Sequence, residues 1–360
     1  MTVAPRLRIL PDEESIFAAI ADRAAEADAG MRGLSEDMAL LADSGILNRL
    51  CSGGDPVAHA DLLRRIGAVS LPVGRLAEGH MNALRLVALY GTAGQRKSHM
   101  TEARRGTIYG VWGADDSPPV AIRSDHGDRL ELEGSKRFAS GLGTIGRAVV
   151  IATTAEGPRL VIADVTDPNR GDDSGWQVSG MRATASGRYD FDGMNAEPLG
   201  KAGDYLREPY FQGGVWRYAA VHVGGLEALA EEVRKAVRGF GDAAGEAQLH
   251  RVARIASLAH GARLFVEDAA RKVEAPGAGA AEVALSLAAR EAVETACLEG
   301  MALADRALGT RSFATGHPAD LLRRDLGFFL RQADLDGKLR QVGQHLCASL
   351  QPVGAIWGGR

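Results

Sequence analysis

The stretch that decides the fold runs from residue 107 to residue 154: TIYGVWGADDSPPVAIRSDHGDRLELEGSKRFASGLGTIGRAVVIATT. It contains the segment GLGTIG (Gly141, Gly143, Gly146), which has the glycine spacing of a dinucleotide-binding loop. Such a loop needs a helix directly after it, because the helix N-terminus faces the pyrophosphate. Here the β-branched run 147–154 follows, and its stiff side chains favour a strand. The glycines therefore predict a turn between two strands.

The overall composition is that of an ordinary soluble globular chain. Its 360 residues are enough for two or three domains, with 46% hydrophobic and 24% charged residues. The net charge of −4 offers no basic surface for nucleic acid. The apolar runs fall short of the roughly 20 residues of a membrane span, and the first residues lack the apolar core of a signal peptide. We therefore expect a cytoplasmic protein that binds neither nucleic acid nor membrane.

The cysteines and histidines do not suggest a metal site or a disulfide framework. Cys51, Cys297 and Cys347 are odd in number and far apart, which is typical of free thiols in a reducing compartment. The 9 histidines are scattered without the spacing of metal ligands. We expect no bound metal.

Hydrophobic periodicity divides the chain into three regions. Residues 1–105 and 203–360 show the helical period, with a helix break expected at Pro72, whereas residues 106–202 show short β-type runs. Turn clusters separate these runs, and this spacing predicts a small barrel or sandwich. The prediction is an α+β chain with an N-terminal helical domain, a middle β domain and a C-terminal helical bundle. Strands are expected at 107–112, 119–123, 129–134, 147–153, 159–165 and 187–192.

Two segments of the middle region carry a family resemblance. They are Tyr109-Gly-Val111-Trp112-Gly and the segment GSKRFASG, which contains Phe138 and Ser140. Together with the domain order, they resemble the acyl-CoA dehydrogenase superfamily over nearly the whole chain. In that family a Y-x-V-T-E strand meets the flavin ring. A G-x-K-x-W-I-T-N-G strand supplies an aromatic cover for one flavin face and a hydroxyl for the ring edge. The resemblance implies that these five residues bind the cofactor.

The roles implied for Phe138 and Ser140 are chemically reasonable. A flavin ring needs a flat apolar neighbour, and a hydroxyl donor at its electron-rich edge stabilises the reduced form. From the residues alone, a core strand residue followed by a turn residue is the alternative description.

Two segments near the C-terminus extend the resemblance. Arg238-Gly-Phe240-Gly is followed by Gln248, eight residues after the phenylalanine, and in the family such a segment reaches the cofactor of a neighbouring subunit. The turn around Gly309 resembles the family's glycine turn beside the pyrophosphate of that cofactor. A guanidinium suits a pyrophosphate because its planar fork pairs with two oxygens. A solvated arginine at a helix end is the alternative. The resemblance implies FAD, with FMN as the second possibility, and a homodimer or homotetramer.

The family's catalytic glutamate is absent from both of its known positions. Nine residues after the arginine of the R-D segment stands Ala333, and the position before the arginine of the first C-terminal helix holds Trp216. The family glutamate removes the proton α to a thioester carbonyl, which a carboxylate of tuned pKa can do. Asp334 and Asp336 are substitutes if the local chain shifts. His80 is a further candidate, because imidazole titrates near neutrality. No catalytic residue is assigned.

Three functions remain open from the sequence. The first is an FAD-dependent, acyl-CoA dehydrogenase-like oxidoreductase that acts on an acyl thioester or a related small hydrophobic substrate. The second is a flavin monooxygenase or oxidase, since family members that activate oxygen dispense with the glutamate and often carry an aromatic near Trp112. The third is a binding or assembly subunit without turnover. Asp115 and Asp116 replace the loop that holds the CoA chain, and two carboxylates repel CoA phosphates.

Overall fold

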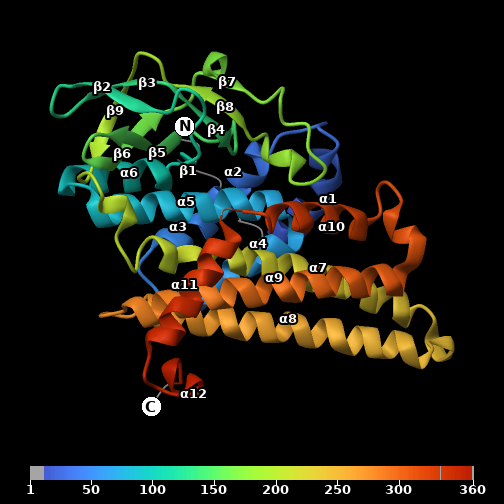
Figure 1. Ribbon diagram of the computed structural model, residues 1–360. Helices are drawn as coiled ribbons and strands as arrows, with labels where there is room; N and C mark the ends of the chain where they lie inside the picture. The colour runs from blue at the N-terminus through green and yellow to red at the C-terminus, as the bar shows by residue number, and fades with distance from the viewer. Residues whose placement is uncertain (1–11, 333, 359–360) are drawn as a thin grey trace, which may run out of the picture.

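The computed structural model describes residues 12–332 and 334–358, and its order of elements is helices, strands, helices. Figure 1 shows the β-rich part at the top, long helices below, and α5 lying between them. The first six helices are α1 (Glu13–Asp28), α2 (Ser35–Asp43), α3 (Ile46–Cys51), α4 (Pro56–Val69), α5 (Leu71–Tyr90) and α6 (Ala93–Arg104).

The break between α4 and α5 lies at Ser70. The Ser70 hydroxyl accepts a hydrogen bond from the backbone N–H of Val73, and Pro72 lies in the first turn of α5. A proline is tolerated there because the first N–H groups of a helix have no partner within it. The sequence-based break at Pro72 was therefore two residues too late.

The middle region forms a closed barrel with a small sheet beside it. The large sheet has the order β1-β5-β2-β3-β9-β6, and an additional β5–β6 pairing closes five of its strands into a ring. The second sheet has the order β4-β8-β7. The strands are β1 (Tyr109–Trp112), β2 (Ala121–Asp125), β3 (Leu130–Glu133), β4 (Ser135–Ala139), β5 (Arg147–Thr154), β6 (Gly157–Asp164), β7 (Gly171–Asp172), β8 (Gly187–Asp190) and β9 (Met194–Leu199).

The glycine-rich segment is the turn that joins β4 to β5, as expected. Gly141 and Gly143 have φ angles of 84° and 75°, a left-handed backbone that favours glycine. All six expected strands are present, within a few residues of their predicted bounds. β4 was expected from the resemblance and from the turn after it, although not from periodicity, whereas β7 and β9 were not predicted.

The remaining helices form an antiparallel bundle under the β-rich part. α7 (Trp216–Arg238), α8 (Glu246–Val273) and α9 (Ala280–Leu308) lie side by side in Figure 1, and α4 packs across α7. α10 (Pro318–Phe329), α11 (Leu335–Ala348) and α12 (Val353–Ile356) complete the chain. Within the described residues no helix has both the length and the apolarity needed to cross a bilayer.

Candidate functional site

The Phe138 side chain forms an exposed aromatic surface at the end of β4. The pairing of β4 with β8 shifts register between Lys136 and Ala139, so the residues in between leave the regular ladder. Phe138 has a φ of 54° and is 57% exposed. A left-handed backbone costs a residue other than glycine roughly 1–2 kcal/mol, and such strain gathers at functional sites. This ring is therefore the first element of the candidate site.

Lys136 fastens the base of β4 to the chain just after β1. Its buried Nζ donates to Oδ1 of Asp115 at 2.5 Å and to the carbonyl that follows β1 at 3.2 Å. Burial lowers the pKa of Lys136, and Asp115 opposes this shift.

The indole of Trp112, the last residue of β1, donates to the carbonyl of Ser140 at 3.1 Å and lies 5.2 Å from the Tyr189 ring. Trp112 therefore fills the barrel core and holds the turn after Phe138.

Ser140 belongs to a chain of hydroxyl groups. The Ser186 hydroxyl donates to the Ser140 hydroxyl at 2.9 Å, and Thr184 Oγ1 lies 2.9 Å from the Ser186 hydroxyl. The Thr184 hydroxyl in turn donates to the carbonyl of Met181 at 2.7 Å. Because these bonds orient one another, the half-buried Ser140 hydroxyl is held in place, 3.5 Å from the carbonyl oxygen of Phe138.

The loop between β7 and β8 adds a second aromatic ring that the sequence did not reveal. The Trp176 ring lies 6.2 Å from Phe138 and 5.4 Å from Phe328 of α10, edge-on to both. Met181 and Ala185 in the same loop have φ angles of 57° and 41°. Phe138, Met181 and Ala185 are three of the four positive-φ residues other than glycine in the described part of the chain. Backbone strain is concentrated here.

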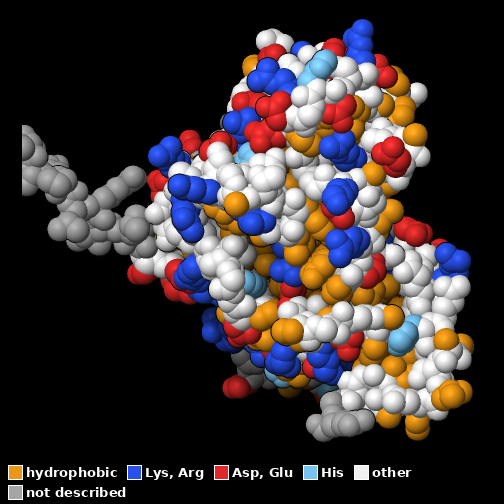
Figure 2. Space-filling view, turned by 90° about the vertical axis from the view of Figure 1, so that its left-hand side faces the viewer, with side chains coloured by type: hydrophobic (Ala, Val, Ile, Leu, Met, Phe, Trp, Pro, Cys, Tyr) orange, Lys and Arg blue, Asp and Glu red, His pale blue; other side chains and the backbone are white. Residues whose placement is uncertain are grey.

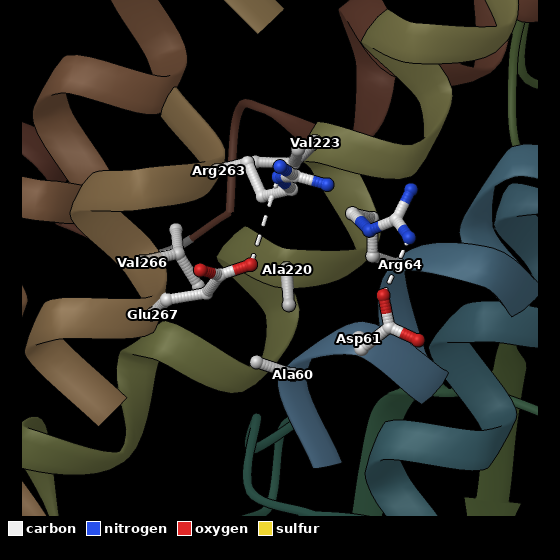
Figure 3. Close-up of a pocket in the computed structure, with 8 residues that line it drawn as sticks. All are labelled: Ala60, Asp61, Arg64, Ala220, Val223, Arg263, Val266 and Glu267. Carbon is white, nitrogen blue, oxygen red and sulfur yellow. Dashed lines mark hydrogen bonds and ion pairs between the residues drawn. The ribbon is translucent and has the colours of Figure 1, made fainter. Parts of the chain in front are cut away.

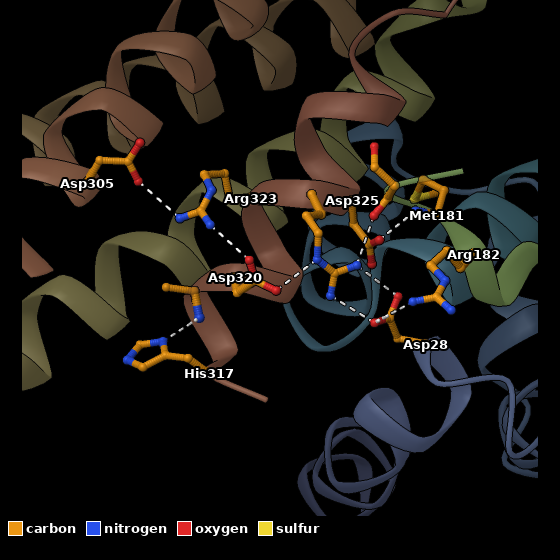
Figure 4. Close-up of polar contacts among 11 residues, drawn as sticks. Asp28, Met181, Arg182, Asp305, His317, Asp320, Arg323 and Asp325 are labelled. Carbon is orange, nitrogen blue, oxygen red and sulfur yellow. Dashed lines mark hydrogen bonds and ion pairs between the residues drawn. The ribbon is translucent and has the colours of Figure 1, made fainter. Parts of the chain in front are cut away.

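An ion-pair network fastens this loop to α10 and α1 (Figure 4). Arg324 donates to Asp28 Oδ2 and to Asp320 Oδ2, each at 2.8 Å. The next residue, Asp325, accepts a hydrogen bond from the backbone N–H of Met181 at 2.5 Å. Burial raises the pKa of Asp325 to about 7. The family-like R-D segment therefore positions the loop that carries Trp176.

Tyr109 and Val111 are the other β1 residues expected to bind the cofactor. Their side chains and that of His80 lie between β1 and the N-terminal helices. Tyr109 is fully buried; its hydroxyl donates to Glu102 at 3.2 Å and lies 3.0 Å from His99 Nδ1. Its backbone N–H donates to Nδ1 of His80 at 3.0 Å. Burial lowers the pKa of His80 to about 4, so its ring is neutral and accepts this bond. Val111 is half-buried on the same side. Of the four residues of β1, only Val111 is not fully buried.

A second group of predicted residues lies at the tip of the bundle. Gln248 Nε2 donates to the carbonyl of Ala307 at 3.1 Å, which places the start of α8 beside Gly309, the cap of α9. Phe240 is 38% exposed. Arg238 is exposed and forms no hydrogen bond or ion pair with the described residues. Figure 1 places the α7–α8 turn at one end of the bundle, away from β4.

The alternative base position holds a buried tryptophan beside a carboxylate. The indole of Trp216 donates to Glu274 Oε1 at 3.2 Å, and Arg217 Nη2 donates to the same oxygen at 2.6 Å. Arg85 pairs with the other oxygen of Glu274. Three donors therefore occupy three of the roughly four lone-pair sites of this carboxylate, which is engaged in ion pairs inside the protein.

The remaining base candidates lie at the start of α11. Asp334 is the N-cap residue of α11 with a φ of 50°, and Asp336 lies in its first turn; both are exposed. Ala333 lies outside the described residues. Among the described residues no cluster of histidine, cysteine and carboxylate side chains is arranged to hold a metal ion.

Two hollows of the described chain lie between helices. The first is a small recess between α4, α7 and α8, where Arg64 pairs with Asp61 and Arg263 with Glu267 (Figure 3). The second is a surface groove between α7 and α8. Neither is lined by β4. Figure 2 shows a different hollow, where apolar side chains gather between the β-rich part and the bundle, with basic side chains around them.

No protein-family model and no curated protein matches the sequence. Solved structures do match it. TdsC from Paenibacillus sp. A11-2, in complex with FMN and indole, has a TM-score of 0.82 at 18% identity, covering 96% of this chain and 98% of that chain. Butyryl-CoA dehydrogenase from Megasphaera elsdenii has a TM-score of 0.78 at 17% identity, with 94% and 99% covered. The methanesulfinate monooxygenase MsuC from Pseudomonas fluorescens has a TM-score of 0.76 at 21% identity, with 96% and 98% covered.

These similarities extend over nearly the full length of each chain. The expected fold, with a β-barrel between two helical parts, is confirmed, and so is the resemblance to acyl-CoA dehydrogenases at the level of the fold. Since one fold supports several chemistries, the function has to be argued from the site.

Proposed function

We propose that the chain is a flavin-dependent oxidoreductase whose flavin lies against Phe138. The observation that carries this proposal is the strained backbone that presents this half-exposed ring beside the oriented hydroxyl of Ser140. The pair fits a flavin, because an isoalloxazine ring needs an apolar face and a donor at its edge. The bound flavin supplies the electron-transfer chemistry. The protein supplies the surface, the hydrogen bonds and the substrate pocket.

The tip of the bundle supports FAD as the cofactor. Arg238, at the exposed end of α7, forms no hydrogen bond or ion pair with the described residues and has Glu231 as a nearby negative charge. A diphosphate is a suitable partner for it, since the guanidinium fork matches two oxygens. FMN carries one phosphate and leaves this tip without a ligand, so FMN is the second candidate. If Arg238 binds the cofactor of a neighbouring copy, the protein has to be an oligomer, and we propose a homodimer or homotetramer.

The lack of a carboxylate at the two family base positions favours oxygen activation over acyl-CoA dehydrogenation. Dehydrogenation needs a base for the proton α to the carbonyl. Trp216 and Ala333 occupy the two base positions, and Glu274 beside Trp216 is held by three donors. An oxygenase on a small hydrophobic substrate needs no such base. The second candidate is an acyl-CoA dehydrogenase-like enzyme whose base is Asp334 or Asp336.

One purification tests these proposals. We expect the protein to carry a yellow flavin chromophore that denaturation releases, and mass spectrometry to identify it as FAD. With reduced flavin, the protein should consume oxygen in the presence of a small aromatic substrate, and anaerobic acyl-CoA should not bleach the flavin. Bleaching by acyl-CoA would favour the dehydrogenase. Protein that takes up neither FAD nor FMN would contradict the oxidoreductase and favour a binding or assembly subunit.

A further inference from the structure

His222 is a buried histidine without a hydrogen-bond partner. It lies on α7 with none of its surface exposed, and neither ring nitrogen has a partner among the described residues. His80 and His99, which are also buried, both have partners. Two unsatisfied ring nitrogens in a protein interior are costly, and native proteins keep such groups where a ligand or water completes them.

The surroundings of His222 are aromatic and electrically balanced. The Phe329 ring of α10 lies 4.4 Å away at 87°, and the Tyr218 ring lies 5.6 Å away. Burial, helped by Arg290 and Arg75, lowers the pKa of His222 to about 3, so the ring is neutral and offers one donor and one acceptor.

Each of the two nearby arginines already has a carboxylate partner. Arg290 pairs with Glu294, and Arg75 pairs with Glu78. Neither guanidinium is left without a counter-ion, so the surroundings favour neither an anionic nor a cationic ligand. The unmet need is for hydrogen bonds to the imidazole of His222.

Contacts connect His222 to the Phe138 surface. On α5, Leu76 packs against the turn that follows Ser140, within 2.9 Å of where a Cβ on Gly141 would lie. The adjacent Arg75 acts electrostatically on both Tyr218 and His222. On the other side, α10 carries Phe328 toward Trp176 and the adjacent Phe329 toward His222. His222 therefore lies at the junction of α5, α7 and α10, behind the candidate flavin surface.

We propose that His222 binds the substrate, and that the substrate is an uncharged aromatic compound with a hydroxyl group that forms a hydrogen bond with one ring nitrogen of this imidazole. Tyr218 and Phe329 supply the aromatic walls for such a compound. The proposal rests on the proposed function, because it makes this junction the substrate side of the flavin site. Because His222 is fully enclosed, the compound can enter only if a neighbouring side chain such as Tyr218, which is 8% exposed, moves.

The test compares phenol with toluene as probes on the purified, flavin-loaded protein. Calorimetry should show that wild-type protein binds phenol at least tenfold more tightly than toluene, which differs by the lack of the hydroxyl. His222→Phe keeps the ring shape and removes both nitrogens, so it should abolish this preference while leaving the flavin spectrum unchanged. Its Tm should equal or exceed that of the wild type, because two unsatisfied groups are lost.

His99→Phe is the matched control, because it removes a buried histidine whose ring nitrogens lie 3.0 Å from Tyr109 Oη and 3.3 Å from Glu197. This variant should lower the Tm and keep the phenol preference. His222→Gln restores one donor and one acceptor, should recover part of the preference, and covers the case in which the phenylalanine variant does not fold. Equal binding of phenol and toluene by the wild type, or a phenol preference that survives in His222→Phe, would overturn the proposal. Loss of flavin binding by the wild type would instead overturn the oxidoreductase assignment.

Discussion

At the residue scale, Asp325 links the stability of the site to pH. Its carboxylate accepts the Met181 N–H, and burial raises its pKa to about 7. In an unfolded chain the pKa of an aspartate is about 3.9. The folded state therefore binds the proton more tightly. The stability that Asp325 contributes is complete below about pH 4 and is lost as the pH rises through about 7.

Asp325→Asn should remove this dependence, since an amide oxygen still accepts the Met181 N–H but does not ionise. Relative to wild type, we expect the variant to be about 1–3 kcal/mol more stable at pH 8 than at pH 5, that is, to have a larger free energy of unfolding. Urea unfolding at the two pH values measures it. Asp336→Asn, at an exposed position, is the control and should show no such difference. Parallel pH dependence of wild type and Asp325→Asn would contradict the prediction.

At the scale of elements, the crossing of α4 and α7 fixes the helical layer beneath the β-rich part. A Cβ on Gly224 would lie 2.0 Å from the carbonyl oxygen of Arg64, and one on Gly67 would lie 2.3 Å from that of Val221. These atoms are backbone and cannot turn aside. The two helices therefore approach as closely as they do because both contact positions lack a side chain.

Gly224→Ala should force the two helices apart and lower the free energy of unfolding by about 3 kcal/mol. Gly261→Ala is the matched control, because Gly261 is exposed on α8 and a Cβ there meets no atom within 4 Å. That substitution should raise stability by up to about 1 kcal/mol through helix propensity. Chemical denaturation of both variants gives the comparison. Equal effects would show that the close crossing has no energetic role.

The elements also show where sequence patterns have predictive value. β5 and β6 are β-branched runs, and α7 has a clear apolar stripe, so their periodicity indicated them correctly. β4 carries Lys136 inside and Phe138 outside, which inverts the usual pattern. The exposure of Phe138 depends on a register shift and a positive φ, and sequence patterns do not show either of these.

The same limit applies to the candidate site. Phe138 and Ser140 were found through a resemblance. Trp176 lies in an irregular loop without periodicity, and His222 occupies the apolar stripe of α7. That His222 has no partner, whereas His80 does, follows from packing among helices distant in sequence. Only tertiary structure distinguishes the two histidines.

At the scale of the whole molecule, the proposed cofactor contacts lie at two separate places. Phe138 belongs to the β-rich part, near the half of α7 that carries His222. Arg238 ends the same helix sixteen residues later, about 24 Å away at the rise of an α-helix. In Figure 1 the tip that holds Arg238 projects beyond the body of the chain. A site shared between two copies explains why the two groups are apart.

A shared site predicts complementation between two defective variants. Arg238→Ala should weaken FAD retention roughly tenfold by removing a charge-assisted pair, and Phe138→Ala should lower it by removing the ring cover. In a mixed dimer, one of the two sites combines the intact Phe138 of one copy with the intact Arg238 of the other. Co-expression should therefore restore full affinity at about a quarter of all sites, measured as flavin bound per chain. Two variants that bind no more flavin together than apart, in a confirmed mixed oligomer, would place both residues at the cofactor of one chain.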